Sequence, residues 1–412
     1  MSHKKKTAIV LGGTNPHIEL IRQLKERGYY TILLDYLDNP IAKPYADLHV
    51  QESSMDLDKA VKVAREYNAE LVMTACVDQA NITACYVAEQ LGLTKPYSYE
   101  TACRITDKAE MKKAMVSHGI PTTRFMMLEQ DEMPETTDLR FPVMVKPTNT
   151  HGTSGVKKAY NMQQVQAYLP YARSCSRTHG ALLEEYFEGT EVSAYCIVKR
   201  GKAHIIMISE RLSVVEGEDQ VLKCYATVTP PAISEKAKAR IEKAADDIAD
   251  AFGLTNTPLH VQALVNGDDI DIIEFAARVA GGLSYETIRK NLGMDMISAA
   301  IDSYLEKDIE LNYHAPTKYY AVNLVYGKDG IYDHIEGVDA LVADGIVENF
   351  HYYRNPGSKV SQERANSCRI AAFITSGESR KALCEKAGAA FDRLKVFDVN
   401  GVDITRRDLI LK

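Results

Sequence analysis

The most informative segment of this sequence is a strand that ends in a lysine and runs into a loop of glycine and hydroxyl residues. The strand reads Phe-Pro-Val-Met-Val-Lys and ends at Lys146, and the loop contains Gly152, Thr153, Ser154 and Gly155. Backbone N–H groups in such a loop can cradle phosphate oxygens, and the lysine adds a point charge, so the segment suits a triphosphate. It is not a Walker loop, because no Gly-Lys-Ser/Thr follows the glycines. An ordinary hairpin with a solvated lysine is the alternative.

An acidic turn follows further along the chain, between two apolar segments. It carries Glu184 and Glu191, which are seven residues apart. Carboxylates do not bind phosphates, but they accept hydrogen bonds from an adenine amino group or from ribose hydroxyls. The two segments together predict a nucleotide that lies between them, whereas the acidic turn alone is more typical of a solvated surface turn.

Two apolar segments around an Asn-Gly-Asp-Asp turn predict a β-hairpin with polar residues inside it. Gln262 lies on the first strand and Glu274 on the second. A buried polar side chain needs a partner, and a Mg²⁺ ion held by oxygen ligands would supply one. Arg278 follows Glu274 by four residues, and its guanidinium could stabilise charge on a phosphoryl group during transfer. An ion pair between Arg278 and Glu274 at a sheet edge is the alternative.

These residues need elements to position them, and the first hundred residues alternate apolar strands with amphipathic helices. The expected strands cover 7–11, 30–35 and 71–74, and the expected helices cover 18–27, 57–67 and 81–91. This alternation predicts a parallel sheet. The pattern changes near residue 107, where we expect a helix over 108–117 and then antiparallel strands.

Two further regions complete the expected architecture. Apolar residues at three- and four-residue steps predict a helix over 233–252. Beyond residue 310, a strand over 319–325 and a strand–helix–strand unit over 369–399 indicate a third, mixed unit. The predicted fold class is therefore α/β with α+β: a Rossmann-like parallel-sheet domain, a two-lobed middle module and a C-terminal mixed α+β unit.

The composition excludes several classes of function. The chain has 412 residues, enough for two or three domains, and its net charge of -7 gives no basic surface for nucleic acid. The basic start leads into an apolar run of only five residues, too short for a membrane span or a signal peptide. Eight cysteines without a Cys-x-x-Cys motif fit a reducing compartment. We expect a soluble, cytoplasmic protein that acts on small molecules, with a homodimer as the default assembly.

Taken in order, these segments resemble the ATP-grasp superfamily from the first strand to about residue 300. In that family a lysine opens a helix ahead of the second domain, and Lys108 in Thr-Asp-Lys-Ala-Glu matches it. The resemblance implies that Lys108 and Lys146 bind the phosphates of ATP. It also implies that the loop over 152–155 closes over these phosphates.

The remaining candidates match other parts of the family's site. The resemblance implies that Glu184 contacts adenine and that Glu191 binds the ribose hydroxyls. It further implies that Gln262 and Glu274 hold Mg²⁺, with Mn²⁺ as an alternative ion, and that Arg278 lies near the transferring phosphoryl group. The family normally has an acidic residue where Gln262 stands, so the charge of this metal site is lower.

Within the superfamily, the segment Glu-Phe-Ala-Ala-Arg-Val-Ala-Gly-Gly from Glu274 onward most resembles the bacterial L-amino-acid (dipeptide) ligases. The resemblance implies an enzyme that converts a carboxylate, an amino acid or small acid, into an acyl phosphate and joins it to an amine, with release of ADP and phosphate. From their position, residues 284–286 are expected to shape the substrate pocket. The implied domains are a Rossmann-like domain over 1–105, an ATP-grasp domain over 106–308 with lobes 106–180 and 181–308, and a C-terminal domain over 309–412.

Three other interpretations stay open at this point. An ATP-grasp carboxylase or a purine-pathway ligase shares the degenerate motifs. A nucleotide-binding protein without ligase activity would explain Gln262 and Ala276, where the family often has an acid and an asparagine. A dinucleotide-dependent oxidoreductase is suggested by Gly12, Gly13 and Asp35 around the first strands, although the third glycine of that fingerprint is missing.

Overall fold

The computed structural model describes residues 5–148, 155–176, 178–217, 221–363 and 365–412. The N-terminal region forms a parallel sheet of order β3-β2-β1-β4, which confirms the sheet predicted from the strand–helix alternation. The strands are β1 (Lys6–Leu11), β2 (Tyr29–Leu34), β3 (Leu48–Val50) and β4 (Ala69–Met73). The helices of this region are α1 (Asn15–Glu26), η1 (Lys43–Tyr45), α2 (Leu57–Glu66) and α3 (Asp78–Leu91).

Two helices lead from this region into a small antiparallel sheet. They are α4 (Tyr99–Thr106) and α5 (Lys108–Ser117), and α5 has the bounds predicted from the sequence. Asp107 starts α5 because its carboxylate accepts hydrogen bonds from the backbone N–H groups of Ala109 and Glu110, at 2.8 and 3.0 Å. The sheet has the order β5-β8-β6-β7. Its elements are β5 (Phe125–Leu128), β6 (Val143–Pro147), β7 (Lys157–Ala159), α6 (Met162–Cys175) and β8 (Ala181–Glu185).

A larger antiparallel sheet of order β13-β12-β9-β10-β11-β14-β18-β16 forms the centre of the molecule. Its first five strands are β9 (Thr190–Lys199), β10 (Lys202–Glu216), β11 (Val221–Thr229), β12 (Asn256–Asn266) and β13 (Asp269–Ala276). Helix α7 (Glu235–Ala251) packs against this part of the sheet through an alanine and isoleucine stripe, close to the predicted bounds of 233–252. The β12–β13 hairpin is the one predicted around the Asn-Gly-Asp-Asp turn.

The C-terminal residues continue the same sheet. They contribute β14 (Tyr319–Tyr326), β16 (Asn349–Tyr352) and β18 (Arg369–Gly377). The remaining C-terminal elements are β15 (Gly330–Glu336), α10 (Val338–Ala343), β17 (Lys359–Val360), α11 (Ala365–Cys368), α12 (Arg380–Arg393) and β19 (Lys395–Asp398). One sheet therefore spans the residues expected in the large lobe and in the C-terminal unit, and the domain boundaries near 105, 180 and 308 stay predictions.

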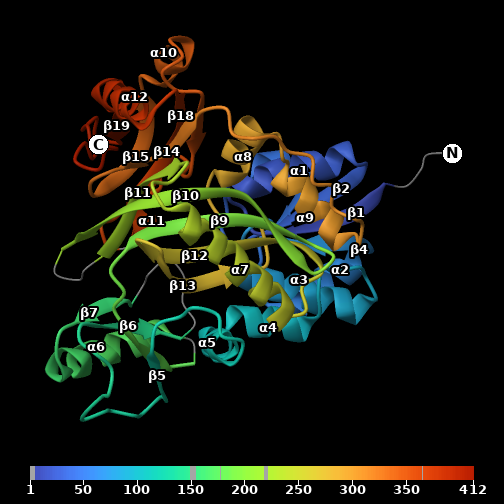
Figure 1. Ribbon diagram of the computed structural model, residues 1–412. Helices are drawn as coiled ribbons and strands as arrows, with labels where there is room; N and C mark the ends of the chain where they lie inside the picture. Colours follow the sequence, from blue (N-terminus) through green and yellow to red (C-terminus); the bar gives the residue numbers. More distant parts are fainter. Residues whose placement is uncertain (1–4, 149–154, 177, 218–220, 364) are drawn as a thin grey trace.

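Figure 1 shows how these parts surround the site discussed below. The small sheet with α6 lies on one side of β12 and β13, and the parallel sheet lies beyond the far ends of β9 and β10. Two helices, α8 (Ser284–Leu292) and α9 (Met296–Tyr304), join the large sheet to the N-terminal region. Arg27 on α1 forms an ion pair of 2.7 Å with Asp302 on α9, and this ion pair joins the two helices. None of the helices in the described part of the chain is long and apolar enough to cross a membrane.

Candidate active site

Glu184 on β8, the residue predicted to contact adenine, lies in a buried charge cluster. Its carboxylate forms ion pairs with the ammonium groups of Lys146 on β6 and Lys112 on α5, and accepts a hydrogen bond from Thr123 Oγ1 at 2.8 Å. Only 3% of the Glu184 side chain is exposed, so the alternative of a solvated acidic turn does not hold at this residue. Burial disfavours the charge, but Lys146 and Lys112 outweigh it and lower the pKa of Glu184 to about 2.

The two predicted phosphate lysines lie in one connected group. Lys108 opens α5, and its Nζ lies 3.2 Å from Oε2 of Glu274 on β13. Lys108 lowers the pKa of Glu274 to about 2, against the effect of burial. Burial would lower the pKa of Lys146, but Glu184, Asp271 and Glu274 outweigh it and raise that pKa. Lys108 and Lys112 lie one turn apart on α5, and Lys112 and Lys146 pair with the same Glu184 carboxylate, so the two predicted lysines belong to one connected group.

Glu191, the predicted ribose residue, stands on the large sheet near the predicted metal residues. Its Oε1 accepts hydrogen bonds from Arg211 Nε on β10 at 2.6 Å and from Gln262 Nε2 on β12 at 3.2 Å. Gln262 pairs directly with Glu274 in the β12–β13 register. Gly189 makes this arrangement possible, since a Cβ there would lie 2.7 Å from the carbonyl oxygen of Val265 on β12. The connection from β8 to β9 can therefore pass against the hairpin.

Arg278 reaches across to the N-terminal region. Its Nε and Nη2 each lie 2.8 Å from a carboxylate oxygen of Asp78, at the start of α3. Glu274 pairs with Lys108, so the alternative of an Arg278–Glu274 ion pair does not hold. Burial would lower the pKa of Arg278, but Asp78 outweighs it and raises that pKa. The bidentate contact orients the guanidinium from outside the large sheet.

A neutral histidine fills the space between these charges. Burial, together with Arg278 and Arg211, lowers the pKa of His260 on β12 to about 3, while Glu274 acts in the opposite direction. The ring stacks on Tyr195, with centroids 5.5 Å apart and planes at 15°. An imidazole with so low a pKa is uncharged at neutral pH and is a poor base there.

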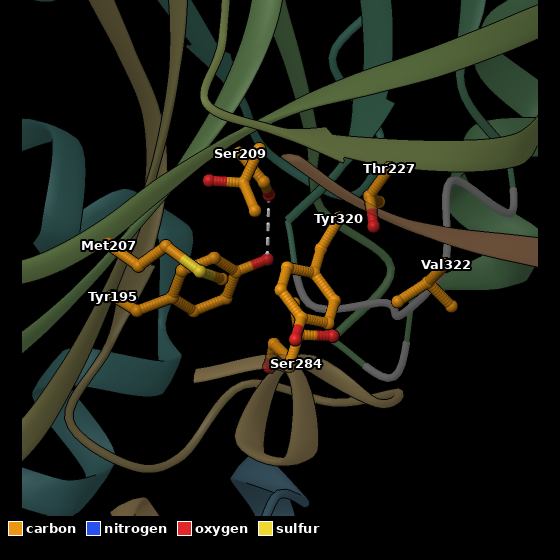
Figure 2. A pocket seen from close by; sticks show the side chains of 9 residues that line it. Tyr195, Met207, Ser209, Thr227, Ser284, Tyr320 and Val322 are labelled. Atoms are coloured by element: carbon orange, nitrogen blue, oxygen red, sulfur yellow. Dashed lines mark hydrogen bonds between the residues drawn. The ribbon is translucent and has the colours of Figure 1, made fainter. Parts of the chain in front are cut away.

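The hydroxyl of Tyr195 points away from this charge cluster into a small internal cavity. Figure 2 shows its hydrogen bond to Ser209 Oγ, which is 2.9 Å long. Tyr320 and Ser284 close the cavity on the other side. Its volume of about 10 Å³ holds one water molecule at most, so this cavity supports the packing of Tyr195 and is no substrate pocket.

A larger cleft of about 710 Å³ lies between α1, α8 and the strands β15 and β16. Tyr285 and Glu286, two of the three residues expected to shape the substrate pocket, line this cleft. The third, Ser284, lines the small cavity. Glu286 is buried, and its Oε2 lies 2.7 Å from Nε2 of His351 on β16, which joins α8 to the C-terminal strands. Glu286 is thus buried and lines the larger cleft at the same time.

The predicted flexible loop is only partly described. Gly152, Thr153 and Ser154 lie outside the described residues. Gly155 has φ of +78°, and a Cβ there would lie 2.9 Å from Cβ of Cys175 and 3.1 Å from Pro147. A glycine is therefore required where the loop returns toward β7.

The structure brings most of the predicted residues together and adds others. Four residues that sequence reasoning missed belong to the group: Lys112, Asp78, Arg211 and His260. Lys112 had a usable signal, because it follows Lys108 by one helical turn and shares its helix face. Asp78 had none, since it lies 200 residues from its partner Arg278.

Comparisons with known proteins agree with this geometry. Residues 139–286 match the family model of the ATP-grasp domain. These residues therefore form an ATP-grasp domain. The fold, and the group of lysines and carboxylates described above, agree with this class of domain. Residues 323–397 match the model of L-amino acid ligase C-terminal domain 2. The chain thus combines a segment that matches the ATP-grasp domain with a second segment that matches the C-terminal domain of the L-amino acid ligases.

Curated relatives are distant in sequence. Multifunctional protein ura1 of Schizosaccharomyces pombe is 23% identical over 305 residues, which cover 71% of this chain and 13% of that protein. Alanine–anticapsin ligase of Bacillus subtilis is 23% identical over 322 residues, which cover 70% of this chain and 66% of that protein. The chain thus spans only a small part of the first of these relatives.

Solved structures share the fold over nearly the whole chain. L-amino acid ligase from Bacillus licheniformis superposes with a TM-score of 0.77 at 17% identity, covering 97% of this chain and 100% of that chain. The biotin carboxylase domain of 2-oxoglutarate carboxylase from Hydrogenobacter thermophilus, solved with MgADP, has a TM-score of 0.77 at 13% identity, covering 98% and 92%. At such identities the likeness shows the fold alone.

Proposed function

We propose that this protein is an ATP-dependent carboxylate–amine ligase that forms an acyl phosphate and releases ADP and phosphate. The observation that supports the proposal is the pairing of Lys108 with Glu274 and of Lys146 with Glu184, because Lys146, Glu184 and Glu274 all lie inside the segment that matches the ATP-grasp domain model. The C-terminal domain favours an amino acid as the activated carboxylate, because that domain is the one found in L-amino acid ligases. The sequence identities to the relatives are too low for their substrates to be assigned to this protein.

ATP is proposed to bind along the line of the charged residues. Each lysine ammonium carries three N–H donors, and Lys108 and Lys146 each spend one on a carboxylate, which leaves donors for phosphate oxygens. Glu184 is proposed to contact adenine, and Glu191 the ribose hydroxyls. The loop over 152–155 is proposed to close over the phosphates and to keep water from the acyl phosphate.

A magnesium ion fits the residues present only with help from the nucleotide. Among the described residues, no cluster of three or more His, Cys, Asp or Glu side chains is suited to a metal ion. Gln262 donates its amide nitrogen to Glu191, which leaves its carbonyl oxygen for a cation beside Glu274. Mg²⁺, or Mn²⁺ in its place, would neutralise phosphate charge when bound to these two residues and to the nucleotide.

The chain's own residues account for the rest of the proposed reaction. The substrate carboxylate attacks the γ-phosphorus, the new O–P bond forms, and the bond from the γ-phosphorus to the bridging oxygen breaks, so that ADP leaves. The lysines and Arg278 stabilise the charge on the transferred oxygens. Asp78 holds the Arg278 guanidinium in one orientation, so no reorganisation is required during the transfer. The amine then displaces phosphate from the acyl carbon: the new C–N bond forms, the C–O bond to phosphate breaks, and phosphate takes the proton.

Product analysis tests the proposal. The protein is incubated with ATP, Mg²⁺ and a pooled library of amino acids and organic acids, and nucleotides and coupled products are measured by mass spectrometry. We expect ADP and phosphate whose release depends on added substrate, together with an amide product. AMP and pyrophosphate would point to adenylate chemistry and contradict the proposal. Dependence on bicarbonate alone would favour an ATP-grasp carboxylase.

A nucleotide-binding protein without ligase activity is the second candidate. The observation that favours it is the pair Gln262 and Ala276, which lowers the charge available for a metal. The same incubation separates the two, since this candidate binds ATP without substrate-dependent turnover. A cytoplasmic location and a homodimer stay predictions, and analytical ultracentrifugation measures the latter.

A further inference from the structure

One ring nitrogen of His260, on β12, is buried without a partner. Its Nε2 forms no hydrogen bond within the described part of the chain. The fully buried His17 is different, because its Nδ1 and Nε2 lie within hydrogen-bond distance of two threonine hydroxyls, at 2.9 and 3.0 Å. A buried polar atom without a partner is costly, so the bare nitrogen of His260 indicates a ligand that binds there.

Packing accounts for the face of the His260 ring but not for its edge. The ring stacks on Tyr195, the residue directly opposite it on β9, with centroids 5.5 Å apart and planes at 15°. The nitrogens of an imidazole lie in the plane of the ring, so a stacked neighbour does not occupy them. When the proton is on Nδ1, Nε2 presents a lone pair, and this is the form in which a histidine binds a metal ion.

The β12–β13 register places the His260 ring on the face of the sheet that carries the proposed metal residues. Gln262 lies opposite Glu274, and His260 lies opposite Ala276, two residues further along each strand. Residues that are opposite in a ladder share a face of the sheet, and so do residues that are two apart on one strand. The side chain of Ala276 is only a methyl group, so it leaves space beside the imidazole.

Gln262 and Glu274 each keep an oxygen atom for the same ligand. Gln262 donates its amide N–H to Glu191 at 3.2 Å, which leaves its carbonyl oxygen. Lys108 lies 3.2 Å from Oε2 of Glu274, which leaves Oε1. An imidazole nitrogen, an amide oxygen and a carboxylate oxygen form a donor set for a divalent transition metal ion. The nucleotide has to supply further ligands, because the described residues contain no group of three His, Cys, Asp or Glu side chains suited to a metal ion.

We propose that Nε2 of His260 is a third protein ligand of the metal ion that accompanies the nucleotide, so that this site prefers a transition ion such as Mn²⁺ to Mg²⁺. This inference rests on the proposed function, because it adds a ligand to the same site. Mg²⁺ is a hard cation that takes oxygen ligands, whereas an imidazole suits softer divalent ions. The nitrogen therefore determines which ion the site selects.

Pulsed electron paramagnetic resonance of bound Mn²⁺ tests this ligand without turnover. The protein is mixed with ADP and a substoichiometric amount of Mn²⁺, and the modulation of the electron spin echo by nitrogen nuclei is recorded. We expect the ¹⁴N coupling of a coordinated imidazole, and a ¹⁵N coupling in its place when the histidines of the protein are labelled with ¹⁵N. The labelling excludes the adenine nitrogens, and it does not depend on the folding of a variant.

Three substitutions show which histidine binds the ion and what it selects. His260→Gln should lose the nitrogen coupling and weaken Mn²⁺ binding by about tenfold or more, with a smaller effect on Mg²⁺. His204→Asn is the matched control, at a half-buried histidine on β10 of the same sheet, and it should keep the coupling and the affinity. Ala276→Asn combined with His260→Gln adds an amide oxygen on the same face and should shift the preference toward Mg²⁺.

The possible results separate this inference from the ligase proposal. Mn²⁺ that binds with ADP but shows no histidine coupling, or a coupling that persists in His260→Gln, would overturn the inference and leave the ligase proposal intact. Equal affinities of the wild type for Mn²⁺ and Mg²⁺ would contradict the proposed selectivity. A wild-type protein that binds neither ADP nor Mn²⁺ would overturn the proposed function, and this inference with it.

Discussion

Glu184 neutralises two lysine ammonium groups in a part of the molecule that water barely reaches. Lys112 and Glu184 are each 3% exposed, whereas Lys146 is 16% exposed and lies on the side of the proposed nucleotide. A buried carboxylate without its cations would carry a large desolvation cost. We therefore propose different roles for the two lysines: Lys112 stabilises the fold, and Lys146 provides an ammonium group for the phosphates.

Lys146→Ala removes the ammonium proposed to bind phosphate. Because Lys112 still neutralises Glu184, we expect the variant to fold, as measured by circular dichroism. We expect substrate-dependent ADP formation to fall at least ~100-fold, the scale of losing one preorganised charge contact. Lys236→Ala, at a lysine that is 82% exposed, is the control. Unchanged turnover in Lys146→Ala would count heavily against the assignment.

Lys112→Met tests the proposed structural role of Lys112. The variant leaves Glu184 with one cation in place of two, and we expect the free energy of unfolding in urea to fall by roughly 3 kcal/mol. Lys113→Met is the matched control, since Lys113 is 64% exposed and pairs with Glu110 one turn away. The control should cost at most ~0.5 kcal/mol. Equal losses in the two variants would show that the buried cluster contributes no more than a surface pair.

Sequence reasoning predicted residues better than it predicted their partners. Lys108, Lys146 and Glu184 were expected at a nucleotide and Glu274 at a metal ion, and the structure pairs Lys108 with Glu274 and Lys146 with Glu184. Their roles toward ATP stay predictions. The pairing of Arg278 with Asp78 could not be predicted, because no local pattern links residues that meet only after two domains have folded.

At the scale of elements, the β12–β13 hairpin sets the composition of the proposed metal site. Its register places Gln262 opposite Glu274, and the next strand, β9, contributes Glu191. An acid in place of Gln262 would put a third carboxylate into this group. We therefore expect the amide to lower repulsion between the carboxylates and to weaken the proposed binding of Mg²⁺.

Gln262→Glu tests whether a carboxylate at this position raises the affinity for Mg²⁺ and destabilises the metal-free protein. We expect the Mg²⁺ concentration that gives half-maximal ADP formation to fall by about tenfold, equivalent to ~1.4 kcal/mol. We also expect a lower melting temperature without Mg²⁺, because the new carboxylate lies beside Glu191 and Glu274. Gln262→Leu is the control and should raise the Mg²⁺ requirement. An unchanged requirement in both variants would place the cation elsewhere.

Elements with local signals were predicted from the sequence, and the long-range sheet was not. Asp107 and the lysine-rich pattern after it give α5 its predicted bounds, and the turn after Asn266 gives the hairpin. The pairing of β11 with β14 joins residues about a hundred positions apart, with no turn between them to indicate it. The sequence therefore predicted a separate C-terminal unit, although the strands of that unit extend the central sheet.

At the scale of the whole molecule, ionic and polar contacts add to a shared apolar core that joins the N-terminal region to the rest. Arg278 binds Asp78, Arg27 binds Asp302, and Asn15 binds the carbonyl of Tyr352. The orientation of Arg278 in the proposed site therefore depends on Asp78 of the N-terminal region. A ligand that binds there should stabilise the assembled arrangement by mass action.

Buried histidines make this assembled fold sensitive to acid. Burial lowers the pKa of His17 from 6.5 to about 4, and its ring contacts Thr14 and Thr74 at 2.9 and 3.0 Å. The unfolded chain takes up the proton more readily, so the stabilisation is complete above pH 6.5 and is lost as the pH falls toward 4. Between pH 6.5 and pH 5, the contribution of His17 to the free energy of unfolding falls by roughly 2 kcal/mol.

His17→Gln isolates the pH-dependent contribution of His17 to stability. The variant has no titrating ring, so its stability deficit relative to the wild type should narrow by roughly 2 kcal/mol between pH 7 and pH 5. Urea unfolding at a series of pH values measures the difference. Other groups, including Asp271, whose pKa is raised to about 6 by burial, cancel in the comparison. A deficit independent of pH would show that His17 is not buried in its neutral form.

The central claim is that a carboxylate receives the γ-phosphoryl group of ATP at the site formed by Lys108, Lys146, Glu274 and Arg278. Isotope transfer tests it most directly: a substrate carboxylate labelled with ¹⁸O is turned over with ATP and Mg²⁺, and the phosphorus-containing products are analysed by mass spectrometry. An acyl phosphate transfers an ¹⁸O atom to inorganic phosphate, and this is the predicted result. Label in AMP, or phosphate without label, would contradict the account.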